Sequence, residues 1–288
     1  MVALRGGRNK RTPSALPRNV RSFQFSIEDA AYPGAMHEQR VALVTGANQG
    51  IGLQIAKELA ARDITVLVGS RNLARGIEAA KSIGRDARPI QLDVTDRVSI
   101  AEAERRIRSE LGRLDILVQN AAISNVRKTQ LGQSMAEFAK EAVASKVSID
   151  EVRAIWDTNV FGVLAVYQAM LPLLREAPAA RIVNVSSGVG SLSRNSDPSF
   201  PYRHLFTPGY SASKTALNAL TVSMATELDG TTIKVNAVSP GFTKTNLNGY
   251  EGTETVEQGA AEAVKMALIG DDGPHGGFTG ATLGTIPW

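Results

Sequence analysis

The chain has 288 residues, 43% of them hydrophobic, which is enough for one large domain with a sizeable core. Cysteine is absent, so a disulfide framework and a cysteine nucleophile are excluded, and with only three histidines we expect no metal site. The net charge of +4 comes from residues 1–35, which hold six basic and two acidic residues, so the remainder offers no net basic surface for nucleic acid.

Residues 1–35 contain few large apolar residues, and they predict a disordered basic extension before a single domain at 36–288. Two other interpretations stay open: a basic targeting segment, because no acidic residue precedes Glu28, and a start at Met36, shortly before the first strand. No apolar run approaches the roughly 20 residues of a membrane-spanning helix, so we expect no span. The lack of cysteine fits a reducing cytoplasm.

From Arg40 onward, short apolar runs alternate with longer stretches of helical spacing. The apolar runs predict strands at 41–44, 64–69, 88–92, 114–118, 181–186, 232–238 and, at the edge of the sheet, 277–283. The periodic stretches predict helices at 51–61, 73–83, 96–111, 148–174, 211–228 and 255–269, with a short extra helix at 134–144. This alternation predicts an α/β fold: a doubly wound parallel sheet with helices on both faces, which binds ligands at the carboxyl ends of its strands.

Local signals predict details of three helices. Asn72 is expected to cap the helix at 73–83, and Ser148 with Glu151 has the spacing of a capping box at the start of 148–174. In the helix at 96–111, the residues expected to face the sheet are Val98, Ala101 and Ile107.

Two connections are long for a compact domain, 124–146 and 188–209. The second leads directly into Tyr210, and we therefore expect a binding loop there rather than a surface insertion that packs on the body. Its rings and apolar side chains favour a hydrophobic ketone or aldehyde over a charged sugar; they are Pro198, Phe200, Tyr202 and Phe206.

Three glycines lie in the turn between the first strand and the first helix, in the pattern Thr45-Gly46-x-x-x-Gly50-x-Gly52. Side chains at 46 and 50 would keep a pyrophosphate away from the backbone N–H groups, and the first amides of a helix are unpaired and attract anions. Gly52, without a Cβ, allows the helix to pack close to the strand. An ordinary tight turn also uses glycine, but the flanking strand and helix indicate a dinucleotide site and a Rossmann-like domain.

Tyr210 and Lys214 are four residues apart and share one face of a helix. A phenol titrates near ~10, and a neighbouring ammonium is expected to lower that pKa, as proton transfer at a carbonyl oxygen requires. Ser187 follows the fifth strand, where its hydroxyl is placed to bond the same oxygen, and Asn159 inside a helix is placed to hold a water. Each residue alone also fits an ordinary structural role.

The chain resembles the classical short-chain dehydrogenase/reductase (SDR) family over about residues 40–283. The motifs that carry the resemblance occur in the family's order: Thr45-Gly-x-x-x-Gly-x-Gly52, Asp93-Val94, Asn120-Ala-Ala122, Asn159, Ser187, Tyr210-x-x-x-Lys214 and Pro240-Gly241. The long connection before Tyr210 is similar to that of the carbonyl reductase and menthone/salutaridine reductase branch. So are Gly273-Pro-His-Gly-Gly-Phe278 and the final Pro287-Trp288.

The resemblance implies a catalytic set. Tyr210 would be the general acid in reduction and the base in oxidation, and Lys214 would lower its pKa and bind the nicotinamide ribose. Ser187 would orient and polarise the carbonyl group, and Asn159 would support a water-linked proton relay.

The resemblance also implies cofactor-binding positions. Asp93 would contact the adenine with Val94 beside it, Asn120 would line the adenosine ribose region, and Thr245 would lie near the nicotinamide carboxamide. The expected set is Gly46, Asn48, Gln49, Gly50, Ile51, Gly52, Ser70, Arg71, Asn72, Asp93, Val94, Asn120, Ala121, Ala122, Tyr210, Lys214, Pro240, Gly241, Thr243 and Thr245. Where the family often has Asn-Asn-Ala-Gly, this chain has Gln119-Asn-Ala-Ala122, whose last methyl group would tighten the cofactor wall.

The end of the second strand, Gly69-Ser70-Arg71-Asn72, lacks the acidic residue that usually binds the ribose 2′-OH of NAD. Arg71 is placed to pair with a 2′-phosphate, with Ser70 and Asn48 as neutral donors. The alternative, a surface arginine near a helix start, is opposed by the helix dipole. We therefore predict NADP(H) in preference to NAD(H).

The sequence thus predicts an NADP(H)-dependent oxidoreductase that reduces a hydrophobic ketone or aldehyde. An acyl-carrier-linked or steroid ketone reductase of the same family is one alternative, and the long connection before Tyr210 speaks against a minimal acyl-carrier reductase. A non-catalytic NADP-sensing protein is another, and the presence of all four catalytic positions speaks against it. We expect a small-molecule substrate and either a monomer or a homotetramer.

Overall fold

The computed structural model describes residues 39–126 and 134–288, and the predictions for residues 1–35 lie outside these ranges. The described strands form one sheet in the order β3-β2-β1-β4-β5-β6-β7-β8. Neighbouring strands pair in parallel, except that β8 is antiparallel to β7. The strands are β1 (Val41–Val44), β2 (Thr65–Ser70), β3 (Ala87–Gln91), β4 (Ile116–Gln119), β5 (Arg181–Val185), β6 (Lys234–Ser239), β7 (Gly277–Gly280) and β8 (Gly284–Thr285).

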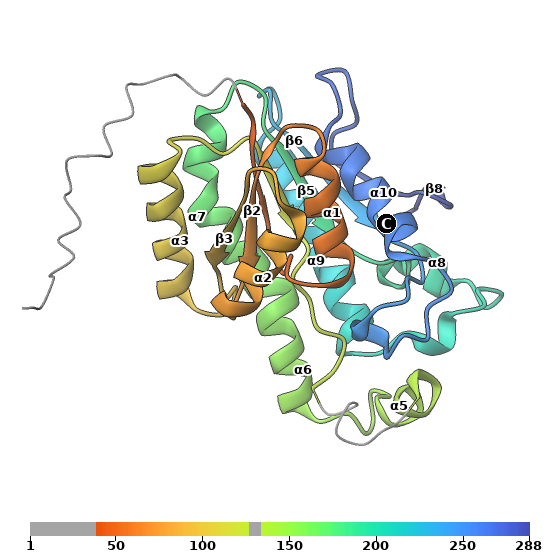
Figure 1. The fold of residues 1–288 in the computed structure, drawn as a ribbon. Coiled ribbons are helices and arrows are strands. Elements are labelled where there is room, and N and C mark those ends of the chain that lie inside the picture. Colours follow the sequence, from red (N-terminus) through yellow and green to blue (C-terminus); the bar gives the residue numbers. More distant parts are fainter. Residues whose placement is uncertain (1–38, 127–133) are drawn as a thin grey trace, which may run out of the picture. The chain divides into compact units, whose positions relative to one another are not determined.

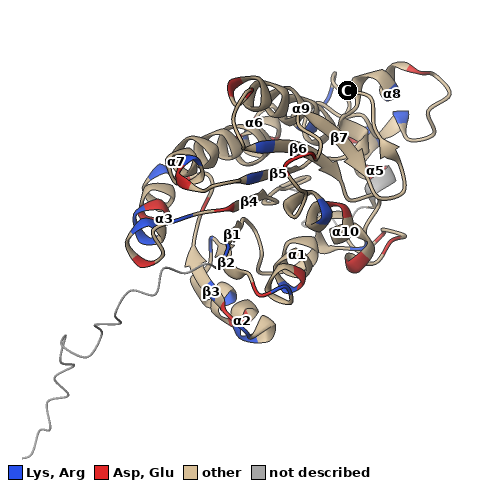
Figure 2. Ribbon diagram, turned by 90° about the horizontal axis from the view of Figure 1, so that it is seen from above, with Lys and Arg blue, Asp and Glu red and all other residues tan. Residues whose placement is uncertain are grey.

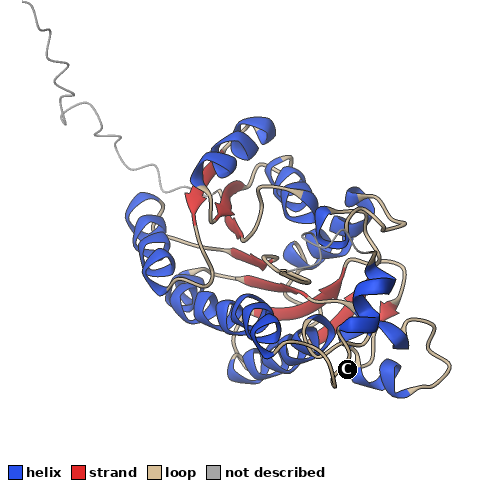
Figure 3. Ribbon diagram, turned by 90° about the horizontal axis from the view of Figure 1, so that it is seen from below, coloured by secondary structure: helices blue, strands red, loops and turns tan. Residues whose placement is uncertain are grey.

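Helices cover both faces of this sheet (Figures 1 and 3), as the alternating pattern predicted. Seen from above, α3, α7 and α9 lie on one side of the strands and α1, α2 and α10 on the other (Figure 2). The helices are α1 (Gly50–Ala60), α2 (Leu73–Ile83), α3 (Arg97–Glu110), α5 (Met135–Glu141), α6 (Ile149–Trp156), α7 (Val163–Glu176), α8 (Leu192–Ser196), α9 (Tyr210–Glu227) and α10 (Val256–Ala267). A π-helical segment, Asp157–Gly162, joins α6 to α7.

The central strands β1, β4 and β5 are buried along their whole length. This is why each reads as a continuous apolar run rather than an alternating one, since a parallel sheet is covered on both faces. One core cluster lies between the sheet and α3, α7 and α9, around Met170 and Leu217, and a second lies toward α1 and α10, around Ile55 and Val264.

The prediction for the buried face of α3 was wrong at two of three positions. Ile107 is buried as expected, but Val98 is 76% exposed and Ala101 is exposed. The buried stripe is instead Ile100, Ala103 and Ile107. These residues repeat at helical spacing on one side, and position 98 falls on the opposite side of the helix.

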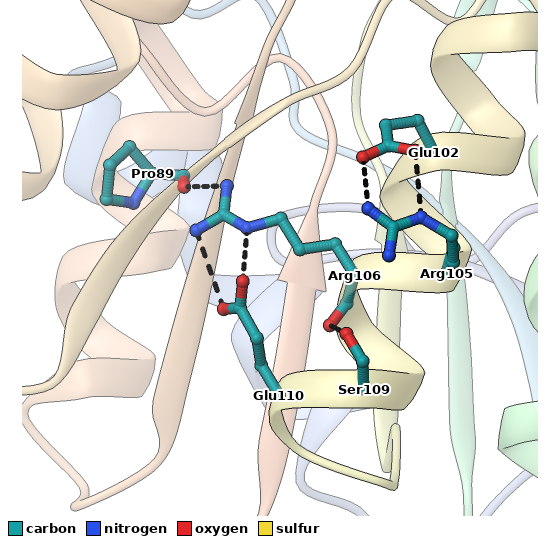
Figure 4. Close-up of polar contacts among 6 residues, drawn as sticks. All are labelled: Pro89, Glu102, Arg105, Arg106, Ser109 and Glu110. Carbon is teal, nitrogen blue, oxygen red and sulfur yellow. Dashed lines mark hydrogen bonds and ion pairs between the residues drawn. The ribbon is translucent and has the colours of Figure 1, made fainter. Parts of the chain in front are cut away.

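The outward face of α3 carries ion pairs, shown in Figure 4. Arg105 pairs with Glu102 at 2.6 Å and Arg106 with Glu110 at 2.6 Å. The Arg106 Nη1 group also donates to the carbonyl of Pro89 in β3 at 3.2 Å. Exposed pairs of this kind are screened by solvent and contribute little, so the apolar stripe and not the charges sets the orientation of α3.

The capping predictions had mixed outcomes. The Asn72 side chain accepts a hydrogen bond from the Arg75 amide at 3.0 Å and caps α2, as predicted. The capping box of Ser148 and Glu151 is absent. Ser148 makes no side-chain cap, and the Glu151 carboxylate accepts from the Val126 amide of the preceding connection.

Two further differences concern the longest helix and the edge of the sheet. The strand predicted at 277–283 ends at Gly280 as β7, and it is not the edge, because the antiparallel β8, which was not predicted, pairs outside it. The continuous run Ile149–Glu176 is long and apolar enough to be a membrane span by length and composition, although none was expected. Half of its most apolar window is buried, and Val166, Met170 and Leu174 belong to the core, which is the pattern of a core helix.

Candidate active site

The glycine turn lies where β1 meets β4, the point at which the strand order reverses. Gly46 has φ +63°, and a Cβ there would lie 2.9 Å from the Cα of Ala121. A Cβ at Gly52 would lie 2.4 Å from the side-chain nitrogen of Asn120. Only glycine fits at these two positions, because the turn is pressed against the residues that follow β4.

Hydrogen bonds of Asn120 and Thr45 stabilise the contact between the glycine turn and the residues that follow β4. The Asn120 Nδ2 group donates to the carbonyls of Thr45 at 2.9 Å and Gly46 at 3.2 Å. In return, the Thr45 Oγ1 accepts from the amides of Asn120 and Ala121, both at 3.0 Å. The side chain of Asn120 is therefore committed to the glycine turn, and Thr45, which the sequence analysis did not include among the site residues, is its partner.

The N-terminus of α1 is suited to an anion. Its N-cap residue Gln49 makes no side-chain cap, and the first turn contains no acidic residue. Gly50 has φ +56°, and its hypothetical Cβ would lie 3.5 Å from the Cγ2 of Thr245. Ile51 packs on the core beneath, so the first amides of α1 lie between the turn and the segment 240–245.

The carboxyl end of β2 carries the residues predicted to select the cofactor. Ser70 is buried and its hydroxyl donates to the Asn72 carbonyl at 2.8 Å, so Ser70 and Asn72 shape the turn into α2. Arg71 is exposed, and its guanidinium makes no hydrogen bond or ion pair with any residue that the structure describes. Asn48, in the neighbouring glycine turn, is half-buried.

The carboxyl ends of β3 and β4 supply the next positions. One carboxylate oxygen of Asp93 accepts from the amide of Thr95 at 3.0 Å and from its hydroxyl at 2.7 Å. Val94 is buried against the π-helical segment, where a Cβ at Gly162 would lie 2.8 Å from the Val94 carbonyl. Ala122 is half-buried after β4.

Asn159 lies in the π-helical segment and is fully buried. Its Oδ1 accepts from the Ile123 amide at 2.9 Å, and its Nδ2 donates to the Ile123 carbonyl at 2.9 Å and to the Ser213 hydroxyl at 3.0 Å. Asn159 thus ties the end of β4 to α9. Ser213, the residue before Lys214, was not predicted to take part, although it lies within the Tyr210-x-x-x-Lys214 motif.

The two serines after β5 have different roles. Ser186 is buried, and its hydroxyl donates to the Asn218 side chain at 2.5 Å, so it anchors β5 to α9. Ser187 is half-buried and makes a side-chain hydrogen bond with Tyr210. The structure therefore brings together the serine and the tyrosine that the sequence analysis chose.

Tyr210 begins α9, and Lys214 lies one turn later. Burial raises the pKa of Tyr210 to about 12, and the hydrogen bond with Ser187 acts in the opposite direction. Burial also lowers the pKa of Lys214 to about 7. The lysine Nζ donates to the Val185 carbonyl at 2.7 Å and lies 5.8 Å from the centre of the Tyr210 ring.

These values correct one expectation. The Tyr-x-x-x-Lys spacing predicted that the Lys214 ammonium lowers the pKa of Tyr210, but in the chain alone that pKa is raised. The reason is that both groups are withdrawn from water, which favours the neutral phenol and the neutral amine. The amine is also hydrogen-bonded to β5 rather than to the phenol.

The segment after β6 closes the other side of the site. The Thr243 hydroxyl donates to the Pro240 carbonyl at 2.9 Å, and Thr245 is buried next to Gly50. Gly241 has φ +77°, and a Cβ there would overlap the carboxylate of Glu254. Burial raises the pKa of this carboxyl group. The sequence analysis gave no signal for Glu254.

Comparison with known proteins agrees with this geometry. The family model described as "short chain dehydrogenase" matches residues 40–255. (-)-Isopiperitenone reductase of Mentha piperita is 32% identical, over 83% of this chain and 96% of its own length, and Short-chain dehydrogenase/reductase 1 of Saponaria officinalis is 34% identical, over 84% and 94%. The structure of salutaridine reductase from Papaver somniferum superposes with a TM-score of 0.70 at 29% identity, covering 83% of this chain and 99% of that one.

SDR proteins are oxidoreductases that bind a nicotinamide cofactor. In this chain the glycine turn, Asn120, Ser187 and Pro240 lie after the carboxyl ends of strands. With three quarters of the chain inside the family model and relatives of this length and identity, the chain belongs to the short-chain dehydrogenase/reductase family, in its menthone/salutaridine reductase-like branch.

Proposed function

We propose that the protein is an NADP(H)-dependent oxidoreductase that reduces the carbonyl group of a hydrophobic ketone or aldehyde to an alcohol, with Tyr210 as proton donor. The observation that carries this proposal is the side-chain hydrogen bond between Ser187 and Tyr210 at the end of β5. Because the two hydroxyl groups meet there, one substrate oxygen can accept a hydrogen bond from both.

The glycine turn and the start of α1 fit the pyrophosphate of a dinucleotide, because residues 46, 50 and 52 carry no side chains of their own and no carboxylate competes in the first turn. When bound, the cofactor supplies the hydride that reaches the carbonyl carbon and is itself oxidised. Tyr210 donates its phenolic proton to the carbonyl oxygen, and Ser187 orients that oxygen. Lys214 is proposed to bind the nicotinamide ribose.

Asn159 is proposed to support the proton relay as a positioning residue. Its amide bridges Ile123 after β4 and Ser213 in α9, so it holds the π-helical segment against the helix that carries Tyr210. A water-linked path to solvent would begin beside this segment, where the backbone departs from regular α-helical hydrogen bonding.

Selection of NADP(H) over NAD(H) is assigned to Arg71. Its guanidinium is exposed at the end of β2, has no partner within the described residues, and no acidic residue stands at 69–72 to repel a 2′-phosphate. A guanidinium can bind a phosphate through two parallel charged hydrogen bonds.

We expect Arg71→Ala to weaken NADPH binding about 10- to 100-fold, the value of a charged hydrogen-bond pair, and to change NADH binding less than about threefold. Fluorescence titration of both cofactors measures this, with Arg62→Ala as a control because Arg62 pairs with Glu58 on α1. Equal losses for both cofactors would refute the role of Arg71.

The substrate is assigned to the groove of the connection 188–209. This open groove has a volume of about 690 Å³, and its wall combines apolar residues, among them Leu192, Phe200 and Phe206, with the polar residues Asn195, Ser196, Arg203 and His204. A concave wall that joins apolar side chains to a few polar groups is typical of small-molecule sites. The direct test is a panel of aldehydes and ketones with NADPH, followed by nicotinamide absorbance. Turnover of apolar carbonyl compounds is expected, and turnover of none of them would contradict the proposal.

A further inference from the structure

Arg194 carries a guanidinium that the proposed reaction does not yet use. It lies in α8, seven residues after Ser187, and its side chain is half-buried. Its guanidinium makes no hydrogen bond or ion pair with any residue of the described parts of the chain. Half-burying a charge without an ion-pair partner is unfavourable, which makes this guanidinium a candidate for binding an anionic ligand.

The position of this guanidinium is defined by two contacts. One is with the Phe200 ring, whose centre lies 4.5 Å from the Arg194 Cζ. Phe200 is in turn held edge-on by Tyr202, with ring centres 5.8 Å apart. Stacking on a supported aromatic ring fixes the plane of a guanidinium and leaves its N–H groups free at the edge.

The second contact places the guanidinium at the active site. A Cβ built on Gly188 would lie 3.2 Å from the Arg194 Nη1 and 3.6 Å from the Ser239 hydroxyl. Gly188 directly follows Ser187, and its amide donates to the Ser239 Oγ at 2.9 Å. Ser239 ends β6 and precedes Pro240. Arg194 therefore lies where the carboxyl ends of β5 and β6 meet, one residue from the serine that orients the carbonyl group.

The nearby acidic groups do not neutralise Arg194. The Asp197 carboxylate accepts from the amide and hydroxyl of Ser199, at 2.8 and 2.7 Å. Glu254 lies over Gly241 and has its pKa raised by burial alone. Within the described residues no carboxylate pairs with the guanidinium beside Gly188, so its charge stays positive and its contact is the Phe200 ring.

We propose that Arg194 is a substrate-binding residue that recognises a carboxylate next to the carbonyl group being reduced, so that the substrate class is apolar oxo acids. The proposal rests on the proposed function and makes it more specific. The apolar residues of the groove, Leu192 and Phe206, hold the hydrocarbon part, and Phe200 is shared between the groove and Arg194. The fork of the guanidinium matches the two oxygens of a carboxylate, which a neutral ketone lacks.

The test compares two probes with the same ketone and ring, phenylglyoxylate and its methyl ester, with NADPH as cofactor. Arg194→Met should lower kcat/KM for the acid about 10- to 100-fold, mainly through KM, and for the ester less than about threefold. Arg194→Lys should recover part of the loss, because it keeps the charge without the fork. Arg153→Met is the control, since Arg153 is exposed and pairs with Asp150 on α6.

Equal losses for acid and ester in Arg194→Met, or no loss for either, would overturn the assignment of Arg194. Reduction of the ester by the wild type is a separate readout for the proposed function. If the wild type reduces neither probe, calorimetric titration of phenylglyoxylate into the enzyme with NADP⁺ decides the inference. Binding that Arg194→Met weakens at least about tenfold supports it, and absent or unchanged binding rejects it.

Discussion

Lys214 is a buried amine whose side chain donates a hydrogen bond to the carbonyl of Val185. Burial lowers its pKa to about 7, whereas the unfolded chain would titrate it near ~10.5. Between these values the unfolded chain binds the proton and the folded chain does not, so the free energy of unfolding rises with pH. Above pH ~10 the gain is limited, because Tyr210, with a pKa of about 12, ionises more readily in the unfolded chain.

We therefore expect the free energy of unfolding of the cofactor-free wild type to rise between pH 7 and pH 9.5. This rise should exceed that of Lys214→Met by up to ~3 kcal/mol. Urea unfolding at the two pH values measures this difference. Lys265→Met, which removes an exposed lysine paired with Glu262, should show the wild-type pH dependence. Parallel pH dependences for the wild type and Lys214→Met would show that the amine is not shifted.

The roles of single residues were predictable from the sequence where the local structure or the motif admits only one residue type. Gly46 and Gly52 are required by atoms within 3 Å, and Ser187 could be preferred over Ser186 from the motif alone. The direction of the Tyr210 pKa shift was not predictable, because it depends on how far both side chains are withdrawn from water. The positions of Arg194 and Glu254 at the site were not predictable either, because they depend on the conformation of loops.

Among the elements, the segment at Ile286–Trp288 has a clear structural role. The Trp288 ring stacks on Phe278 of β7 with ring centres 5.4 Å apart. Its carbonyl oxygen accepts from the Ser193 amide at 2.9 Å and hydroxyl at 2.7 Å. The segment thus holds α8, and with it Arg194, against the edge of the sheet.

Trp288→Ala should lower the free energy of unfolding by ~1–2 kcal/mol, and Trp288→Phe should keep most of it, because the stacked pair is retained. Hydrogen exchange should become faster at 188–196 in the alanine variant and stay unchanged in α3, which packs against α7 and β3. Unchanged exchange at 188–196 would mean that the segment does not support α8.

Elements were predicted well where periodicity is unbroken, as for α2, whose bounds agree at both ends. The π-helical segment was not predicted, because its sequence continues the apolar spacing of the helix around it. The capping box at Ser148 failed for a tertiary reason, since Glu151 is used by the amide of Val126. Local patterns cannot report such competition between distant partners.

At the scale of the whole molecule, the strand order brings the carboxyl ends of β1, β4, β5 and β6 side by side. The glycine turn, Asn120, Ser187 and Pro240 follow these four strands and therefore meet at one edge of the sheet. Alternation of strands and helices was enough to predict this, because right-handed crossovers leave few other arrangements. The path of the connection 188–209 across the site was not predictable from the alternation.

The central claim is that the Tyr210 hydroxyl, bonded to Ser187, delivers the proton to a carbonyl oxygen. The measurement that tests it most directly is turnover of a carbonyl substrate by Tyr210→Phe, with NADPH binding measured on the same preparation. We predict that turnover falls at least ~100-fold, the usual contribution of a general acid, while NADPH affinity stays within about threefold of the wild type. Turnover close to that of the wild type, with NADPH still bound, would contradict the account.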